Sequence, residues 1–162
     1  MSTEFTPDTI ETATVAIFPP DMRRVIVIVN EKMGMILPPG WGREEWDIDI
    51  LATAIREVKE EIWLNLREIP GNFLDSSWSN VEDPVVIHQE NFIFPHNQKR
   101  ALNSLYFFRL AENLDESQMI AELQWMNYTK SQISQKSIRI WEREYVILDP
   151  TTKELILGVM QN

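Results

Sequence analysis

The chain of 162 residues contains no cysteine. This absence excludes a disulfide framework, zinc sites built from thiolates and catalysis by a cysteine nucleophile. Long apolar runs are also missing, because the longest, Val25–Val29, is far shorter than the roughly 20 residues that a membrane-spanning helix needs. The polar start, Met1–Thr9, lacks the basic and apolar regions of a signal peptide. We therefore expect a cytoplasmic protein with no membrane partner.

Basic residues are few beside the acidic ones. Lys and Arg total 15 against 25 Asp and Glu, which gives a formal net charge of -10. A chain this acidic is a poor candidate for binding duplex nucleic acid through phosphate contacts. An anionic ligand would need a positive mediator, for which a divalent metal ion is the obvious candidate. Hydrophobic residues make up 44% of the chain, so we expect one globular domain over residues 1–162, with residues 1–10 frayed.

The residue pattern predicts short strands over most of the chain. Alternating or β-branched segments predict strands over 12–18, 24–30, 35–37, 73–79, 84–94, 102–110 and 123–128. A first helix is predicted after Pro38-Pro39-Gly40, with its apolar stripe running from Ile50 to Ile62 and either Asp47 or Asp49 as its cap. Strands before and after a helix indicate the α+β class, with a mixed sheet that carries packed helices.

The end of the chain gives weaker patterns. A second helix is predicted over Thr129–Glu144, with Ile133, Ile138 and Trp141 facing the core. Trp125 is also expected in the core. The tail is compatible with a strand pair around residues 149–153 or with a helix capped at Asp149 or Thr151.

The most informative feature is the acidic face of the first helix. Glu57, Glu60 and Glu61 stand at i, i+3 and i+4, so their carboxylates share one face and repel each other. Clustered hard oxygen ligands are what Mg²⁺ or Mn²⁺ binds, and such an ion can polarise a phosphoryl oxygen and activate a water. A plain solvated helix face is the alternative for these three residues taken alone.

The context of the three glutamates resembles the Nudix box, Gly-x5-Glu-x7-Arg-Glu-U-x-Glu-Glu-x-Gly-U, in which U is aliphatic. Its core is matched without a gap by residues 56–61, Arg-Glu-Val-Lys-Glu-Glu. Leu37-Pro38-Pro39-Gly40 resembles the Leu-Pro-Gly-Gly segment that precedes the family's helix. The similarity covers most of residues 12–145, and its specific part is 37–61. It implies an α/β/α sandwich, a mixed β-sheet flanked by helices.

Two positions depart from the box. Counted back from Arg56, the first glycine falls on Gly42 and the upstream glutamate on Ile48. If Gly40 is the first glycine instead, the loop is two residues longer, Glu44 or Glu45 stands near the missing acid, and Ile48 packs inward. We favour this second register. The closing glycine is replaced by Trp63, which leaves the left-handed turn at the end of the helix in question.

The resemblance also implies roles for individual residues. Glu57, Glu60 and Glu61 would be the metal-binding and catalytic carboxylates, one of them able to act as base, and Arg56 would orient a glutamate. The carbonyl of Gly40 would be a further metal ligand. A later acid would complete the site, and the candidates in order of preference are Glu116, Glu112, Glu122 and Glu90. Trp41 could stack on a nucleobase, although half-buried packing is the commoner role for such a residue.

The sequence therefore predicts a Mg²⁺- or Mn²⁺-dependent hydrolase that cleaves a diphosphate bond in a nucleoside diphosphate linked to another moiety. The partner would be a small-molecule nucleotide or other diphosphate, and a homodimer stays open. One alternative is a catalytically weak nucleotide-binding or regulatory module, because Ile48 and Trp63 replace two positions of the box. A second alternative is an interaction protein whose acidic helix only solubilises it.

Overall fold

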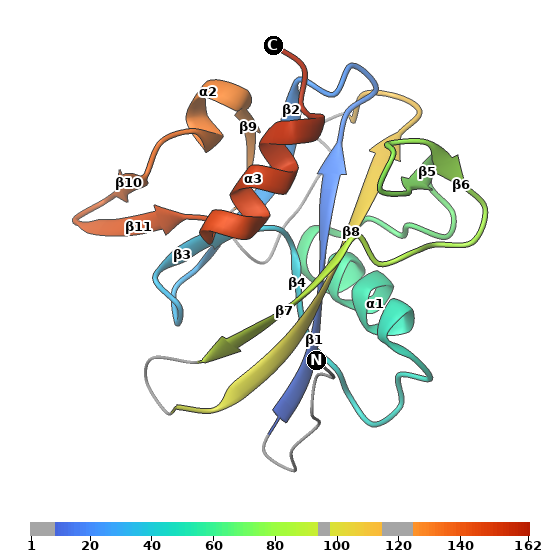
Figure 1. Ribbon diagram of the computed structural model, residues 1–162, viewed down its shortest axis with the longest axis horizontal. Coiled ribbons are helices and arrows are strands. Elements are labelled where there is room, and N and C mark those ends of the chain that lie inside the picture. Colours follow the sequence, from blue (N-terminus) through green and yellow to red (C-terminus); the bar gives the residue numbers. More distant parts are fainter. Residues whose placement is uncertain (1–8, 94–97, 115–124) are drawn as a thin grey trace.

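The computed structural model describes residues 9–93, 98–114 and 125–162 of the chain, which form eleven strands and three helices (Figure 1). The strands are β1 (Thr9–Phe18), β2 (Arg24–Asn30), β3 (Met35–Leu37), β4 (Gly40–Gly42), β5 (Gly71–Leu74), β6 (Asn80–Val81), β7 (His88–Ile93), β8 (Arg100–Leu110), β9 (Trp125–Thr129), β10 (Ser137–Ile140) and β11 (Arg143–Ile147). The helices are α1 (Ile50–Ile62), α2 (Lys130–Ile133) and α3 (Pro150–Val159).

All strands belong to one mixed sheet. Its main path runs β10-β11-β3-β2-β1-β8-β5-β6, while β4, β7 and β9 pair with β1, β8 and β2. The long central strands β1 and β8 run parallel, from Thr9 opposite Arg100 to Phe18 opposite Arg109. Strand β11 is parallel to β3, and the other pairs are antiparallel.

The sheet is covered on both faces, and strand β1 divides the core between them. Its residues Ala13, Val15 and Ile17 pack with the apolar stripe of α1. The alternate residues Ala16 and Phe18 pack with α3 on the opposite face. This division follows from the two-residue period of a strand, which sends successive side chains to opposite faces. The predicted α/β/α arrangement of a mixed sheet flanked by helices is confirmed.

The second predicted helix is wrong beyond its first turn. Thr129 caps the short helix α2, and the chain then forms an antiparallel hairpin in which Ile138 pairs with Tyr145. The hairpin joins the sheet through β11, which pairs with β3 far away in the sequence, so tertiary pairing overrides the local pattern. Trp141 lies in the turn and is 90% exposed instead of facing the core. Trp125 is half-buried.

The remaining tail is a helix. The side chain of Asp149 accepts a hydrogen bond from the backbone N–H of Thr152, and Pro150 occupies the first turn of α3, where its missing N–H costs nothing. Of the expected strand 73–79, only residues 73 and 74 are in a strand, as the end of β5. Of the expected strand 84–94, residues 88–93 form β7, and residue 94 lies outside the described residues. Of the predicted strand 123–128, residues 123 and 124 lie outside the described residues. In the described part of the chain, no helix has the length and apolar character to cross a membrane.

Candidate active site

Helix α1 carries the candidate carboxylates, and its position is fixed by its buried face and its two ends. Ala54, Ile55, Val58 and Ile62 are buried against the sheet. At the start, the Asp49 side chain accepts a hydrogen bond of 2.8 Å from the N–H of Ala52, so Asp49 is the cap and Asp47 is free for another role. The three glutamates lie beside this buried face to different depths, because Glu60 is exposed whereas Glu57 and Glu61 are half-buried.

The helix ends without the usual glycine. Trp63 adopts the left-handed conformation with φ 64°, and its N–H donates to the carbonyl of Lys59 at 3.0 Å. The left-handed turn that the sequence left in question is therefore present. It comes with a conformational cost, because a side chain at this backbone conformation is strained by roughly 1–2 kcal/mol.

Strand β4 brings a backbone group to the helix. Gly40 has φ 128°, and a Cβ atom at this position would lie 2.1 Å from the carbonyl oxygen of Ala13. Only glycine fits here, whereas a side chain at Gly42 would meet no atom within 4 Å. This difference supports Gly40 as the first glycine of the motif. The N–H of Gly40 donates a hydrogen bond of 3.0 Å to Glu61, which connects β4 to the end of α1.

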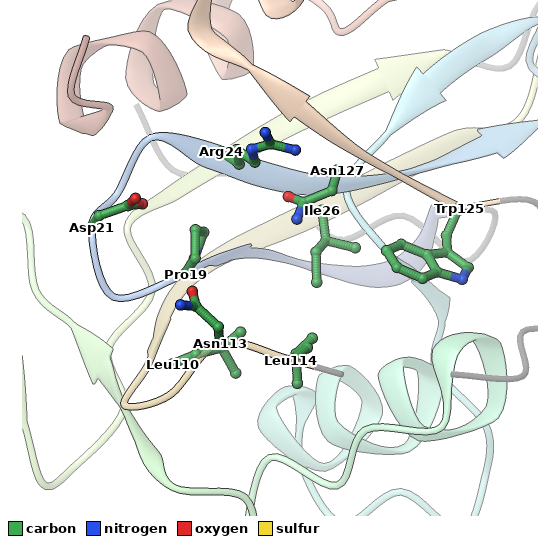
Figure 2. A pocket seen from close by; sticks show the side chains of 9 residues that line it. All are labelled: Pro19, Asp21, Arg24, Ile26, Leu110, Asn113, Leu114, Trp125 and Asn127. Atoms are coloured by element: carbon green, nitrogen blue, oxygen red, sulfur yellow. The ribbon is translucent and has the colours of Figure 1, made fainter. Parts of the chain in front are cut away.

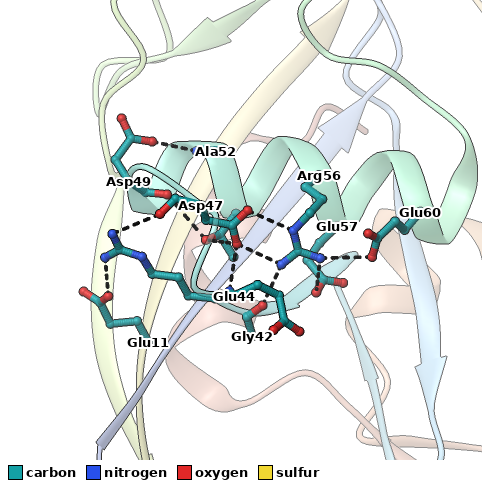
Figure 3. Close-up of polar contacts among 11 residues, drawn as sticks. Glu11, Gly42, Glu44, Asp47, Asp49, Ala52, Arg56, Glu57 and Glu60 are labelled. Atoms are coloured by element: carbon teal, nitrogen blue, oxygen red, sulfur yellow. Dashed lines mark hydrogen bonds and ion pairs between the residues drawn. The ribbon is translucent and has the colours of Figure 1, made fainter.

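Arg56 is the centre of the polar network on α1 (Figure 3). Its Nη1 donates to Glu57 at 3.2 Å and to Glu60 at 3.0 Å. On its other side, Nη2 donates to the carbonyl of Gly42 at 2.9 Å, and both Nε and Nη2 donate to Asp47. One guanidinium group therefore holds two glutamates of the helix and the loop that precedes it.

Asp47 is the functional residue that the sequence reasoning missed. Its carboxylate is buried, receives the two hydrogen bonds from Arg56 and also accepts from the Thr53 hydroxyl and the Glu44 N–H. The hydrogen bonds from Arg56 lower the pKa of Asp47 to about 2, and the same contact raises the pKa of Arg56. Asp47 lies nine residues before Arg56, one more than the box prescribes for its glutamate.

This position of Asp47 corrects two expectations about the loop. The acid that faces Arg56 is neither Glu44 nor Glu45, both of which are exposed. Ile48 does not pack inward, since 85% of it is exposed. The signal that could have identified Asp47 is an acid within one residue of the spacing that the box gives its glutamate.

The three glutamates differ in their environments. Burial raises the pKa of Glu61 to about 8, and the nearby charges of Glu57 and Glu60 act in the same direction. Burial also raises the pKa of Glu57, whose side chain is 15% exposed, against the opposing effect of Arg56. Glu60 has a side chain that is 57% exposed. Two of the three carboxyl groups thus lie where burial disfavours the ionised form.

Comparison with solved structures places this architecture among known folds. A NUDIX-family hydrolase from Clostridium perfringens matches with a TM-score of 0.60 at 17% identity, over 92% of this chain and 94% of the other. The dihydroneopterin triphosphate pyrophosphohydrolase of E. coli matches with a TM-score of 0.62 at 14% identity, over 93% and 94%. The C. elegans Ap4A hydrolase matches with a TM-score of 0.52 at 16% identity, over 76% and 82%. The chain has the Nudix fold. No protein-family model and no curated protein sequence matches it.

Within the Nudix fold, the donor set beside α1 suits a hard cation. The carboxylates of Glu57, Glu60 and Glu61 and the carbonyl of Gly40 offer oxygen ligands. Burial raises the pKa values of Glu57 and Glu61, and the nearby charge of Glu60 adds to the effect. No three acidic or histidine side chains among the described residues are already arranged around one point. The carboxylates are turned toward Arg56 and the Gly40 N–H instead, so a bound ion would have to compete with these donors.

The candidate later acids fall in three places. Glu112 is exposed in the bend that follows β8, and Glu116 and Glu122 lie outside the described residues. Glu90 pairs in register with Asn103, whose side chain bonds to Thr12 and Thr14 on the α3 face of the sheet. Glu90 therefore belongs to the face opposite α1. Its contacts with the start of α3, together with burial, raise its pKa to about 7.

A cavity of about 560 Å³ opens beside the site. Gly40, Trp41 and Glu61 line it together with the end of β2 and the β10–β11 hairpin. Trp41, predicted to bind substrate, is thus brought together with two of the predicted metal ligands. A smaller pocket of about 200 Å³ lies elsewhere on the Nudix fold and contains none of the predicted site residues (Figure 2); its lining residues are Pro19, Asp21, Arg24, Ile26, Leu110, Asn113, Leu114, Trp125 and Asn127.

Proposed function

We propose that the chain is a hydrolase dependent on Mg²⁺ or Mn²⁺ that cleaves a diphosphate bond in a nucleoside diphosphate linked to another moiety. The observation that carries the proposal is that Glu61 and Gly40, which are hydrogen-bonded to each other, both line the 560 Å³ cavity. Glu57 and Glu60 lie next to Glu61 on the same helix. A substrate in this cavity would present its phosphates to the acidic helix. Because the chain has a net charge of -10, a divalent cation would be needed to bring the two anions together.

Each residue has a definite part in this proposal. The ion would be held by Glu57, Glu60, Glu61 and the Gly40 carbonyl, and when bound it would polarise a phosphoryl oxygen and neutralise developing charge. One of the glutamates would take a proton from the attacking water. Arg56 would position Glu57 and Glu60 through the hydrogen bonds it already donates to them. Trp41 would contact the substrate, with stacking on a base contributing roughly 1–3 kcal/mol.

The test is product release from a panel of nucleoside triphosphates, nucleotide sugars and dinucleoside polyphosphates, with Mg²⁺, Mn²⁺ or Ca²⁺ and with chelator. We expect cleavage of at least one substrate that requires Mg²⁺ or Mn²⁺. The same ions should raise the melting temperature, because a ligand that binds only the native state stabilises it. Absence of turnover together with absence of any thermal shift at millimolar metal would refute the proposal.

A nucleotide-binding module without turnover is the second candidate. It is favoured by the engagement of Glu57 and Glu60 with Arg56, because both carboxylates accept hydrogen bonds from its Nη1 atom, which a cation would have to displace. The panel separates the two functions. Nucleotide binding by calorimetry without product release in any metal would support the module.

A further inference from the structure

The cavity beside the site has a wall that comes from the β10–β11 hairpin. Ile140, Trp141 and Tyr145 line it from this hairpin, while Gly40 and Glu61 line it from the acidic site. The cavity therefore connects a group of aromatic and aliphatic side chains to the carboxylates that would face phosphates. Its volume of about 560 Å³ lies within the range of roughly 300–1,000 Å³ that is usual for small-molecule sites.

Trp141 stands out among these residues because its indole takes no part in the core. It is 90% exposed, so it buries almost no apolar surface. It also has φ 58°, in the left-handed region that is unfavourable for a residue with a large side chain. The two-residue turn between Ile140 and Arg143 accounts for this φ. The exposed indole at the edge of the cavity is left where a ligand can contact it.

Backbone hydrogen bonds attach the hairpin that carries this indole to the rest of the sheet. The N–H of Val146 donates to the carbonyl of Gly34 at 3.1 Å, and the N–H of Leu148 donates to that of Ile36 at 3.0 Å. The guanidinium of Arg143 lies over the ring of Tyr145, 5.0 Å from its centroid. These contacts attach the hairpin to β3 and the turn before it. The backbone at Trp141 is thereby held beside the cavity, so that binding has to order the indole but not the hairpin.

We propose that this cavity binds the nucleobase of the substrate and that Trp141 stacks on the base, which makes Trp141 a specificity-determining residue. This inference rests on the proposed function and narrows it to substrates with a flat aromatic group next to the diphosphate. Two tryptophans, Trp41 and Trp141, suit a flat ring better than a sugar or a branched isoprenoid chain. Burial of the exposed indole by the base would add apolar contact that the free protein lacks.

The test compares the Trp141→Ala and wild-type proteins by calorimetry, with Mg²⁺ present, using two probes. The first probe is a nucleoside diphosphate with a methylene bridge in place of the bridging oxygen, tried with adenine and with guanine. The second is inorganic tripolyphosphate, which has no base. Stacking worth roughly 1–3 kcal/mol corresponds to about a 5- to 150-fold change in Kd, so we expect nucleotide binding to weaken by this factor. Tripolyphosphate binding should be unchanged.

Two further variants make the result specific. Trp46→Ala removes another exposed indole, 71% exposed and outside the cavity lining, and should leave both probes at wild-type affinity. Trp141→Phe keeps an aromatic face and should recover most of the nucleotide affinity. Wild-type nucleotide affinity in Trp141→Ala, or equal loss for both probes, would overturn the inference.

The outcome is independent of turnover because the methylene-bridged probes are not cleaved. If the protein binds these probes through Trp141 but hydrolyses no substrate, the proposed hydrolysis is refuted and the proposed stacking stands. If Trp141→Ala hydrolyses nucleotides as fast as the wild type and with the same KM, the proposed hydrolysis stands and the proposed stacking is refuted.

Discussion

Asp47 and Arg56 form a two-point ion pair, in which the Nε and Nη2 atoms of Arg56 each donate to a different carboxylate oxygen of Asp47 at 2.9 Å. The pair connects the loop before α1 to the helix, and it fixes the plane of the guanidinium. The remaining nitrogen, Nη1, is thereby directed at Glu57 and Glu60. Planar two-point pairs of this kind restrict orientation more than a single contact does.

We expect Asp47→Asn to lower both stability and the proposed activity. The substitution leaves the half-buried Arg56 without its main anionic partner, which should cost about 1–3 kcal/mol of unfolding free energy. Loosening of Arg56 should also misplace Glu57 and Glu60 and reduce turnover several-fold. Chemical denaturation and initial rates with Mg²⁺ measure the two effects. Glu44→Gln is the matched control, since the exposed Glu44 side chain should change neither quantity.

The stability of the pair should depend on pH in a defined window. The pKa of Asp47 is lowered from its ordinary 3.8 to about 2 in the folded protein. A lowered pKa means that the stabilisation is complete above the unfolded value and is lost as the pH falls through the folded value. The difference in unfolding free energy between wild type and Asp47→Asn should therefore be constant from pH 5 to 7 and shrink from about pH 4 to pH 2. A difference that does not change between pH 5 and pH 3 would contradict this assignment.

The parts of this site that the sequence predicted are the local ones. The α1 helix follows from a stripe of apolar residues at helical spacing, a capping aspartate and a run of helix-forming residues, all within a single segment. The shared face of Glu57, Glu60 and Glu61 follows from the helix alone. The strands β1, β2 and β8 were also predictable, because their β-branched and aromatic runs are long.

The parts that escaped prediction depend on distant partners. Asp47 reaches Arg56 only because the loop geometry compensates for a spacing that is one residue too long. The segment 137–147 has apolar residues that suit a helix or a strand, and pairing of Val146 with Met35 decides between them. The need for glycine at position 40 arises from the backbone of Ala13, which lies in another strand. The contacts of residues 146 and 40 join segments far apart in the sequence, so no local window shows them.

We expect Glu60→Gln and Glu61→Gln each to reduce turnover by at least roughly tenfold, about 1.4 kcal/mol of barrier. Stability without metal should hold or rise. Glu60→Gln removes a like charge from the acidic face. Glu61, with its pKa raised to about 8, is mostly protonated at pH 7, so Glu61→Gln changes the charge little, and its amide oxygen can still accept from the Gly40 N–H. The thermal shift produced by Mg²⁺ should shrink in both variants. Melting curves with and without metal, together with initial rates, provide the measurement. Glu68→Gln, at an exposed position, is the control; full activity in both helix variants would show that these residues have other roles.

The end of α1 offers a test of backbone strain. Trp63 holds the left-handed conformation at φ 64° with a side chain that is 62% exposed, so the indole contributes little burial in exchange for its strain. Glycine adopts this conformation without that cost, and we expect Trp63→Gly to stabilise the protein by about 1 kcal/mol, or roughly 2–4 °C in Tm. Greater freedom of glycine in the unfolded chain offsets part of the gain. Trp63→Ala, which removes the indole but keeps the strain, should show no gain. Equal melting temperatures for the two variants would mean that the strain at this turn is negligible.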